Sequence, residues 1–109
     1  MVSARDYDRA IAPLSRAAEL SEDGNAYVRL AEIQIQLEAW GQAKTSLERG
    51  VAKGRLRSLG NAEFLLGVAL YGAGKLKEAR GHFQRATEDP ERRAEAEGWL
   101  RYLDVQLRS

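Results

Sequence analysis

The chain has 109 residues, of which 44% are hydrophobic and 30% charged, a balance typical of a folded domain rather than a disordered one. Seventeen basic residues against sixteen acidic ones leave a net charge of +1, which argues against a dedicated nucleic-acid-binding protein. The absence of cysteine excludes disulfides, thiolate metal sites and a cysteine nucleophile.

Membrane insertion is not expected. The segment Met1–Tyr7 has no apolar run of the kind found in signal peptides, and no later segment approaches the ~18 apolar residues of a membrane span. We therefore expect a soluble chain. Its composition is compatible with the cytoplasm and with the periplasm, so the localisation is left unknown.

Apolar residues recur every three or four positions along the whole chain, which predicts helices and no strands. Gly54 is predicted to end one helix in a left-handed cap, and Gly60-Asn61 to open the next. Asp89 is predicted to cap the last helix, with Pro90 as its first residue. The expected helices span residues 5–20, 25–38, 41–54, 61–73, 76–88 and 91–107.

The first and last of these helices have features of their own. Pro13 removes one backbone hydrogen bond inside 5–20 and should bend that helix. The segment 91–107 carries one apolar stripe. Opposite it lie the acid-first pairs Glu97–Arg101 and Asp104–Arg108, each four residues apart, which favour an exposed helix. We expect it to cap the preceding pair of helices; alternatively, Trp99 and Tyr102 form an interaction patch.

An internal repeat links the middle segments. Thirty-six residues separate Gly24-Asn25-Ala26 from Gly60-Asn61-Ala62, and the register continues beyond them. Small residues align with small ones, which lets helices approach closely, and large apolar residues align with large ones. The aligned pairs are Leu30/Leu66, Ala31/Gly67, Trp40/Leu76, Ala43/Ala79, Leu47/Phe83 and Gly50/Ala86.

Over about residues 6–90 the sequence resembles the tetratricopeptide repeat (TPR) family, whose pattern is W-x2-L-G-x2-Y, then A-x3-F, then P. One copy reads Glu63-x2-Leu66-Gly67-x2-Leu70, Ala79-x3-Phe83, Pro90, and the copy before it reads Tyr27-x2-Leu30-Ala31-x2-Gln34, Ala43-x3-Leu47. A partial copy precedes both, with Tyr7, Ala10, Leu14 and Ala17 matching Trp40, Ala43, Leu47 and Gly50.

The sequence departs from this pattern in four ways. The copies are 36 residues apart rather than the usual 34, and Gln34 replaces the aromatic residue. No proline ends the copy that begins at Tyr27, and the partial copy before it lacks its opening helix. Either the chain comes from a longer array, or a partner covers the exposed face of 5–20.

The resemblance implies an all-α, right-handed superhelical stack of antiparallel helix pairs (a TPR-like α-solenoid) with a C-terminal capping helix. We expect a single domain over 1–109. Its parts are a half repeat at 5–20, repeats at 24–58 and 60–90, and the cap at 91–107.

In arrays of this family, the first helix of each repeat lines a concave groove that holds an extended peptide or a helix. The resemblance therefore implies a protein-interaction scaffold. The residues that would face the groove are Asn25, Val28, Glu32, Ile35, Asn61, Phe64, Val68 and Tyr71.

Within this set, the asparagines would bind a ligand backbone, Phe64 and Tyr71 would anchor an apolar side chain, and Glu32 would tune the accepted charge. Alternatively, the asparagines only cap helices and Phe64 belongs to the core. A clamp for C-terminal carboxylates, known in one branch of the family, fits poorly because the surface is mostly apolar. The rival function is self-association through 5–20, giving a homodimer.

Three other features are weak candidates for chemistry. Gly72-Ala73-Gly74-Lys75 lacks the earlier glycine and the Ser or Thr of a phosphate-binding loop, so an inter-helix turn is expected. His82 is the only histidine and is expected to be solvated, as are the loop cations Lys53, Arg55 and Arg57. We expect no catalysis, metal, cofactor, nucleic acid or membrane partner.

Overall fold

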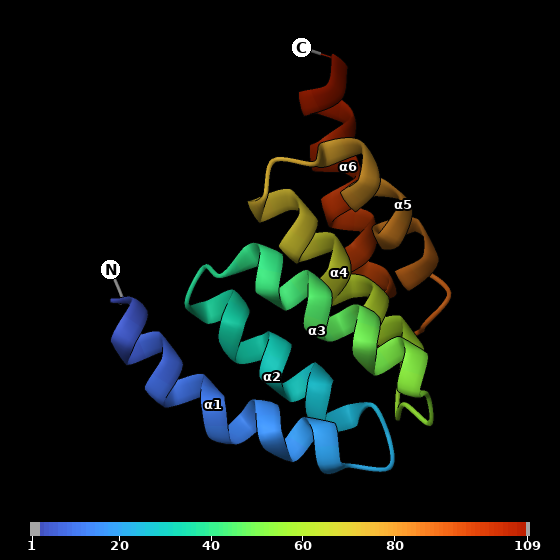
Figure 1. Cartoon of the computed structure of the whole chain (residues 1–109). Coiled ribbons are helices and arrows are strands. Elements are labelled where there is room, and N and C mark those ends of the chain that lie inside the picture. The colour runs from blue at the N-terminus through green and yellow to red at the C-terminus, as the bar shows by residue number, and fades with distance from the viewer. Residues whose placement is uncertain (1–2, 109) are drawn as a thin grey trace. The chain divides into compact units, whose positions relative to one another are not determined.

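The computed structural model describes residues 3–108, which form six helices and no strand (Figure 1). The all-α prediction is confirmed. The chain divides into two compact units, residues 1–57 and residues 58–109. The single domain and its right-handed superhelical stacking stay predictions. The helices are α1 (Ala4–Leu20), α2 (Asn25–Gln36), α3 (Trp40–Lys53), α4 (Leu59–Gly72), α5 (Leu76–Ala86) and α6 (Arg93–Arg108).

In the first unit, α1 packs on α2 and α2 packs on α3, with short turns between them (Figure 1). Ile11 and Ala18 of α1 meet Tyr27 and Leu30 of α2 in one buried cluster, at the spacing that the apolar stripes predict. Small residues permit a close backbone approach: a Cβ on Gly24 would lie 1.9 Å from the carbonyl oxygen of Gly50. The predicted role of small residues is confirmed here.

The Lys53 side chain connects the end of α3 to the end of α1 rather than lying free in a loop. Its Nζ donates to the carbonyl oxygens of Ala18 and Glu19, at 2.8 and 2.9 Å, and lies 5.5 Å from the ring centre of Tyr27. Carbonyls at a helix C-terminus have no partner within the helix, so a lysine from α3 satisfies them and complements the helix dipole. The prediction that Lys53 is merely solvated is wrong.

The loop after α3 shows why Gly54 is glycine. Its φ of 79° confirms a left-handed residue, but its ψ of −164° lies outside the left-handed helical region that a standard cap uses. Arg55 follows with φ 53°. The Asn25 side chain holds this loop, because its Nδ2 donates to the Arg55 carbonyl and its Oδ1 accepts from the Arg57 amide.

In the second unit, α4 packs on α5 and α5 packs on α6 (Figure 1). Its largest fully buried side chains are Phe83, Leu70 and Leu103, one from each helix. Phe83 lies across from Gly67, where a Cβ would approach the ring to 2.7 Å, so glycine makes room for the aromatic side chain. Ala96 and Leu103 bury the apolar side of α6 against this core.

Two helix starts differ from the predictions. Ser58, not Gly60-Asn61, caps α4, because its Oγ accepts from the Asn61 amide at 2.9 Å. Helix α6 begins at Arg93, and Asp89 instead stabilises the preceding turn by accepting from the Glu91 amide at 2.9 Å. The cap at Ser58 could have been predicted from the sequence, because serine is a preferred capping residue.

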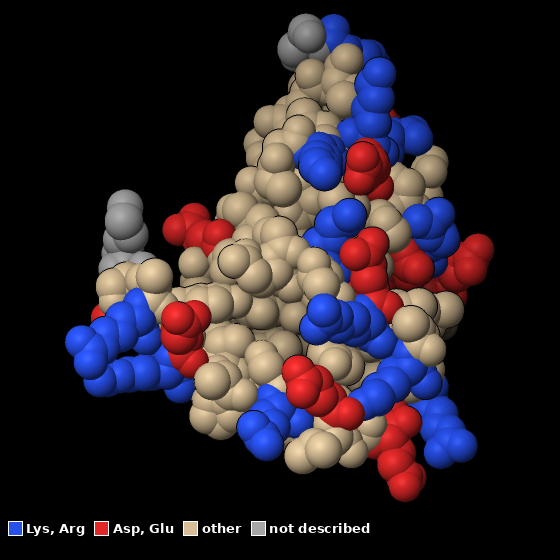
Figure 2. All heavy atoms as spheres, viewed as in Figure 1, with Lys and Arg blue, Asp and Glu red and all other residues tan. Residues whose placement is uncertain are grey.

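Charged side chains are mixed over the surface. On the visible face of each unit in Figure 2, positive and negative side chains are interspersed, as the near-balanced composition suggests. No helix in the described part of the chain is long and apolar enough to cross a membrane.

Candidate functional site

The four groove residues predicted on α2 differ in exposure. Val28 is buried, Asn25 and Ile35 are partly buried, and Glu32 is exposed. Asn25 uses one bond at each end of its side-chain amide to hold the loop at residues 55–57.

The four predicted on α4 separate into core and surface residues. Phe64 is 6% exposed, belongs to the core of the second unit and packs edge to face against Phe83. The guanidinium of Arg92 covers its ring at 4.7 Å and also donates to Asn61 Oδ1. The structure therefore agrees with the alternative that Phe64 belongs to the core. It does not agree with the alternative that Asn61 caps a helix, because Ser58 caps α4.

Val68 and Tyr71 are partly buried against that core. Of the two predicted anchors, Phe64 and Tyr71, it is Tyr71 that lines an open site. It lies at the end of α4, where Trp99 and Tyr102 of α6 meet it, with ring centroids 4.9 and 5.9 Å from its own.

These three rings and Gly98 line an open hollow of about 430 Å³, which we call the aromatic pocket. Gly98 and Tyr102 are four residues apart on α6 and so share a face, and the missing side chain of glycine opens the space between the rings. Pockets with mainly aromatic walls are typical of sites that take an apolar side chain.

The walls of the aromatic pocket are held in place. Trp99 stacks on the buried Phe83 ring, with centroids 5.0 Å apart and planes 7° apart. The hydroxyls of Tyr71 and Tyr102 are 3.0 Å apart, and Gln106 Nε2 donates to the Tyr102 hydroxyl. The hydrogen bond with Tyr71, with a smaller contribution from lost hydration, raises the pKa of Tyr102 above its ordinary 10.0. The pocket is therefore uncharged at neutral pH.

One cation borders this pocket. A terminal guanidinium nitrogen of Arg101 lies 3.9 Å from where a Cβ on Gly98 would stand. The sequence predicts that Arg101 pairs with Glu97, but no such ion pair forms among the described residues. Asp104, predicted to pair with Arg108, instead binds Arg80 at 2.7 Å. Arg101 thus stays available beside the rings.

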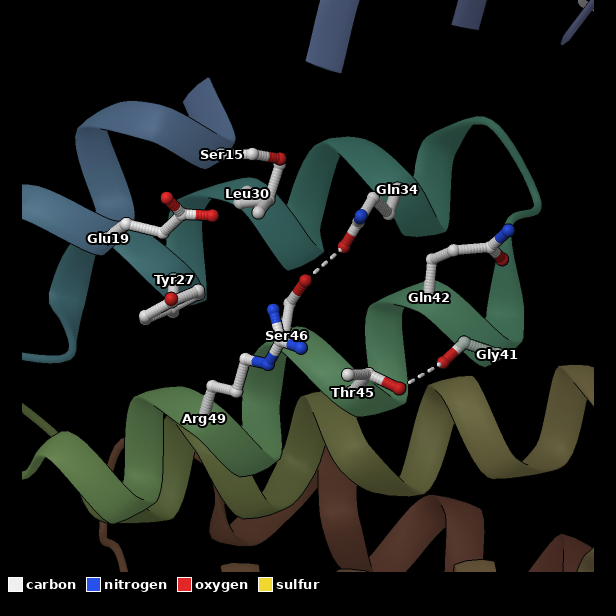
Figure 3. A pocket seen from close by; sticks show the side chains of 10 residues that line it. All are labelled: Ser15, Glu19, Tyr27, Leu30, Gln34, Gly41, Gln42, Thr45, Ser46 and Arg49. Carbon is white, nitrogen blue, oxygen red and sulfur yellow. Dashed lines mark hydrogen bonds between the residues drawn. The ribbon is translucent and has the colours of Figure 1, made fainter. Parts of the chain in front are cut away.

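A second hollow, of about 450 Å³, lies in the first unit and is lined by α1, α2 and α3 (Figure 3). Buried Gln34 lies at its base, where its Oε1 accepts from Ser46 Oγ at 2.7 Å and its Nε2 donates to the Tyr7 hydroxyl at 2.9 Å. Sequence reasoning noted Gln34 only as a departure from the repeat pattern.

His82 is not the solvated residue that was expected. Its Nδ1 lies 2.6 Å from Glu63 Oε2, which also accepts from Arg85 Nε, and the His82 side chain is only 23% exposed. Glu63 is on α4 and His82 on α5, so spacing along one helix could not reveal the pair. Gly72-Ala73-Gly74-Lys75 joins α4 and α5 as the predicted turn, with Gly74 at φ 81°.

Within residues 3–108, no group of three or more His, Cys, Asp or Glu side chains is arranged to hold a metal ion. No family model, curated protein or solved structure matches this chain. The aromatic pocket and the hollow at Gln34 are therefore interpreted from their own geometry.

Proposed function

We propose that this chain is a TPR-like interaction module that binds a segment of a partner protein and carries out no catalysis. The proposal includes right-handed stacking of its helix pairs and a protein ligand, a peptide or a helix, as the repeat pattern implies. The observation that supports it most strongly is the aromatic pocket, which is open, uncharged and already held in shape.

The chemistry of the pocket indicates what the segment should carry. Three aromatic rings suit an apolar or aromatic side chain, whose burial contributes roughly 1.5–3 kcal/mol. Arg101 adds a guanidinium, which suits a carboxylate one or two residues away in the ligand. The rings need no rearrangement before binding, so little of this free energy is spent on ordering them.

Selection from a displayed library of random peptides tests the proposal. A Trp40→Phe background leaves Trp99 as the sole tryptophan, whose fluorescence then reports on the pocket. We expect enriched peptides to combine a large apolar residue with a nearby acid, and to change the Trp99 emission on binding.

The matched variants are Gly98→Leu and Gly81→Leu. A side chain at Gly98 enters the pocket and meets only the flexible Arg101, whereas a side chain at Gly81 meets nothing within 4 Å. Gly98→Leu should weaken the selected peptides by tenfold or more, on the order of 1.4 kcal/mol, and Gly81→Leu should leave them unchanged. Equal binding by both variants would place the ligand elsewhere and refute the proposal.

A further inference from the structure

The hollow of the first unit is built across three helices (Figure 3). Tyr27, Leu30 and Gln34 of α2 form its base, while α1 supplies one wall and α3 the other. Positions 27 to 34 advance about 10 Å along a helix, so the base is long enough for a small molecule.

Gln34 gives this base a fixed polar end. The side chain is 3% exposed and is held between Ser46 and Tyr7 by the two hydrogen bonds described above. The amide keeps one further N–H and one further oxygen lone pair, because each end has used only one bond. A polar group of a ligand can therefore bond there without breaking the existing network.

Two opposite charges stand over the hollow from opposite walls. Glu19 projects from α1 and Arg49 from α3 (Figure 3). Neither side chain forms an ion pair with any residue in the described range, and they do not pair with each other. The nearby Lys53 ammonium is engaged by the α1 carbonyls and leaves the Glu19 carboxylate unpaired.

We infer that this hollow binds a small zwitterion, an α-amino acid with a polar side chain. The ligand carboxylate bonds to the Arg49 guanidinium, and the ligand ammonium bonds to the Glu19 carboxylate. The ligand side chain points toward Gln34 and Ser46, and Tyr27 and Leu30 provide the apolar contact. The inference is independent of the aromatic pocket, since every lining residue belongs to residues 1–57.

Titration of the ¹⁵N-labelled full chain with each of the twenty L-amino acids tests this site by NMR. We expect at least one polar amino acid to give saturable shifts at the amides of residues 15–19 and 42–49 below about 10 mM. Its N-acetyl and carboxamide derivatives each lack one charge and should bind at least tenfold more weakly.

Two variants connect the result to the charges. Arg49→Gln and Glu19→Gln should each weaken binding about tenfold, the change expected from one charge-assisted hydrogen bond. Arg16→Gln, on an exposed position of α1 outside the hollow, is the matched control and should leave binding unchanged. The inference is overturned if no amino acid gives a saturable shift, if the capped derivatives bind equally well, or if both charge variants bind normally.

Discussion

Gly67 lies on α4 and Gly81 on α5, two helices that pack on each other, but the surroundings of the two glycines are opposite. A Cβ on Gly67 would lie 2.7 Å from ring atoms of the fully buried Phe83, which cannot move aside without disturbing the core. A Cβ on Gly81 would meet nothing within 4 Å. The same residue type is thus required for packing at one site and not at the other.

Alanine substitutions should therefore have opposite effects on the free energy of unfolding. We expect Gly67→Ala to destabilise by about 1–3 kcal/mol through overpacking. Gly81→Ala should stabilise by roughly 0.5–1 kcal/mol, because alanine has less backbone entropy to lose in a helix. Urea unfolding followed by circular dichroism measures both, and a stabilising Gly67→Ala would show that Phe83 has room to shift.

At the same scale, the repeat pattern could identify small and large positions but not their exposure. Tyr71 was predicted as a ligand anchor and does line an open pocket, whereas Phe64 was given the same role and lies in the core. Both lie on α4, a helix whose apolar residues are spread around its whole circumference. Which of the two side chains becomes buried depends on where α5 and α6 lie.

Among the elements, α4 and the turn before α6 are joined through one carboxylate. Asp89 accepts from Ser58 Oγ at 2.6 Å and from the Glu91 amide at 2.9 Å, and Gly60 leaves room for it. These two hydrogen bonds, with a smaller contribution from Arg92, hold the pKa of Asp89 below its usual 3.8.

This shift predicts how the stability depends on pH. A carboxyl group whose pKa is lower in the folded state stabilises the fold above its unfolded pKa and loses that effect as the pH falls through its folded pKa. Asp89→Asn should therefore be less stable than the unmodified chain at pH 7, with a smaller difference at about pH 2.5. Urea unfolding at both pH values measures the two differences, and equal differences would mean that the charge of Asp89 is unimportant.

For the whole molecule, self-association through α1 would require an exposed apolar surface on that helix, which the proposed binding function does not require. Its apolar residues Ile11 and Leu14 already pack within the first unit, and Leu20, 78% exposed, is the one large apolar side chain exposed on this helix as described. The remaining exposed positions of α1 are small or charged. Stable dimers usually bury larger apolar surfaces, so we expect α1 not to form a stable dimer interface.

We accordingly expect sedimentation velocity to give the mass of one chain across micromolar concentrations. Leu14→Glu is unsuitable as a test because it places a charge in the core of the first unit. Arg9→Glu with Arg16→Glu alters only exposed positions. A concentration-dependent mass that this double variant abolishes, at unchanged helicity, would favour the homodimer over the monomer.

The sequence by itself determined the helices, the turns between them and the positions of close packing. Helices and turns depend on interactions between residues a few positions apart, so periodicity, glycines and capping residues reveal them. The positions of close packing appear as small residues that align between the copies of the repeat. All six predicted helices begin and end within two residues of the bounds observed in residues 3–108, which is the usual uncertainty of helix ends. The cap at Ser58 was missed although serine signals it.

Only the tertiary structure decided which side chains meet across helices. Tyr71 joins Trp99 and Tyr102, His82 pairs with Glu63, and Glu19 stands across a hollow from Arg49. In each case the partners come from different helices, and their encounter depends on how each helix is rotated about its axis. That rotation follows from how all the apolar stripes pack together, which spacing along one helix does not specify.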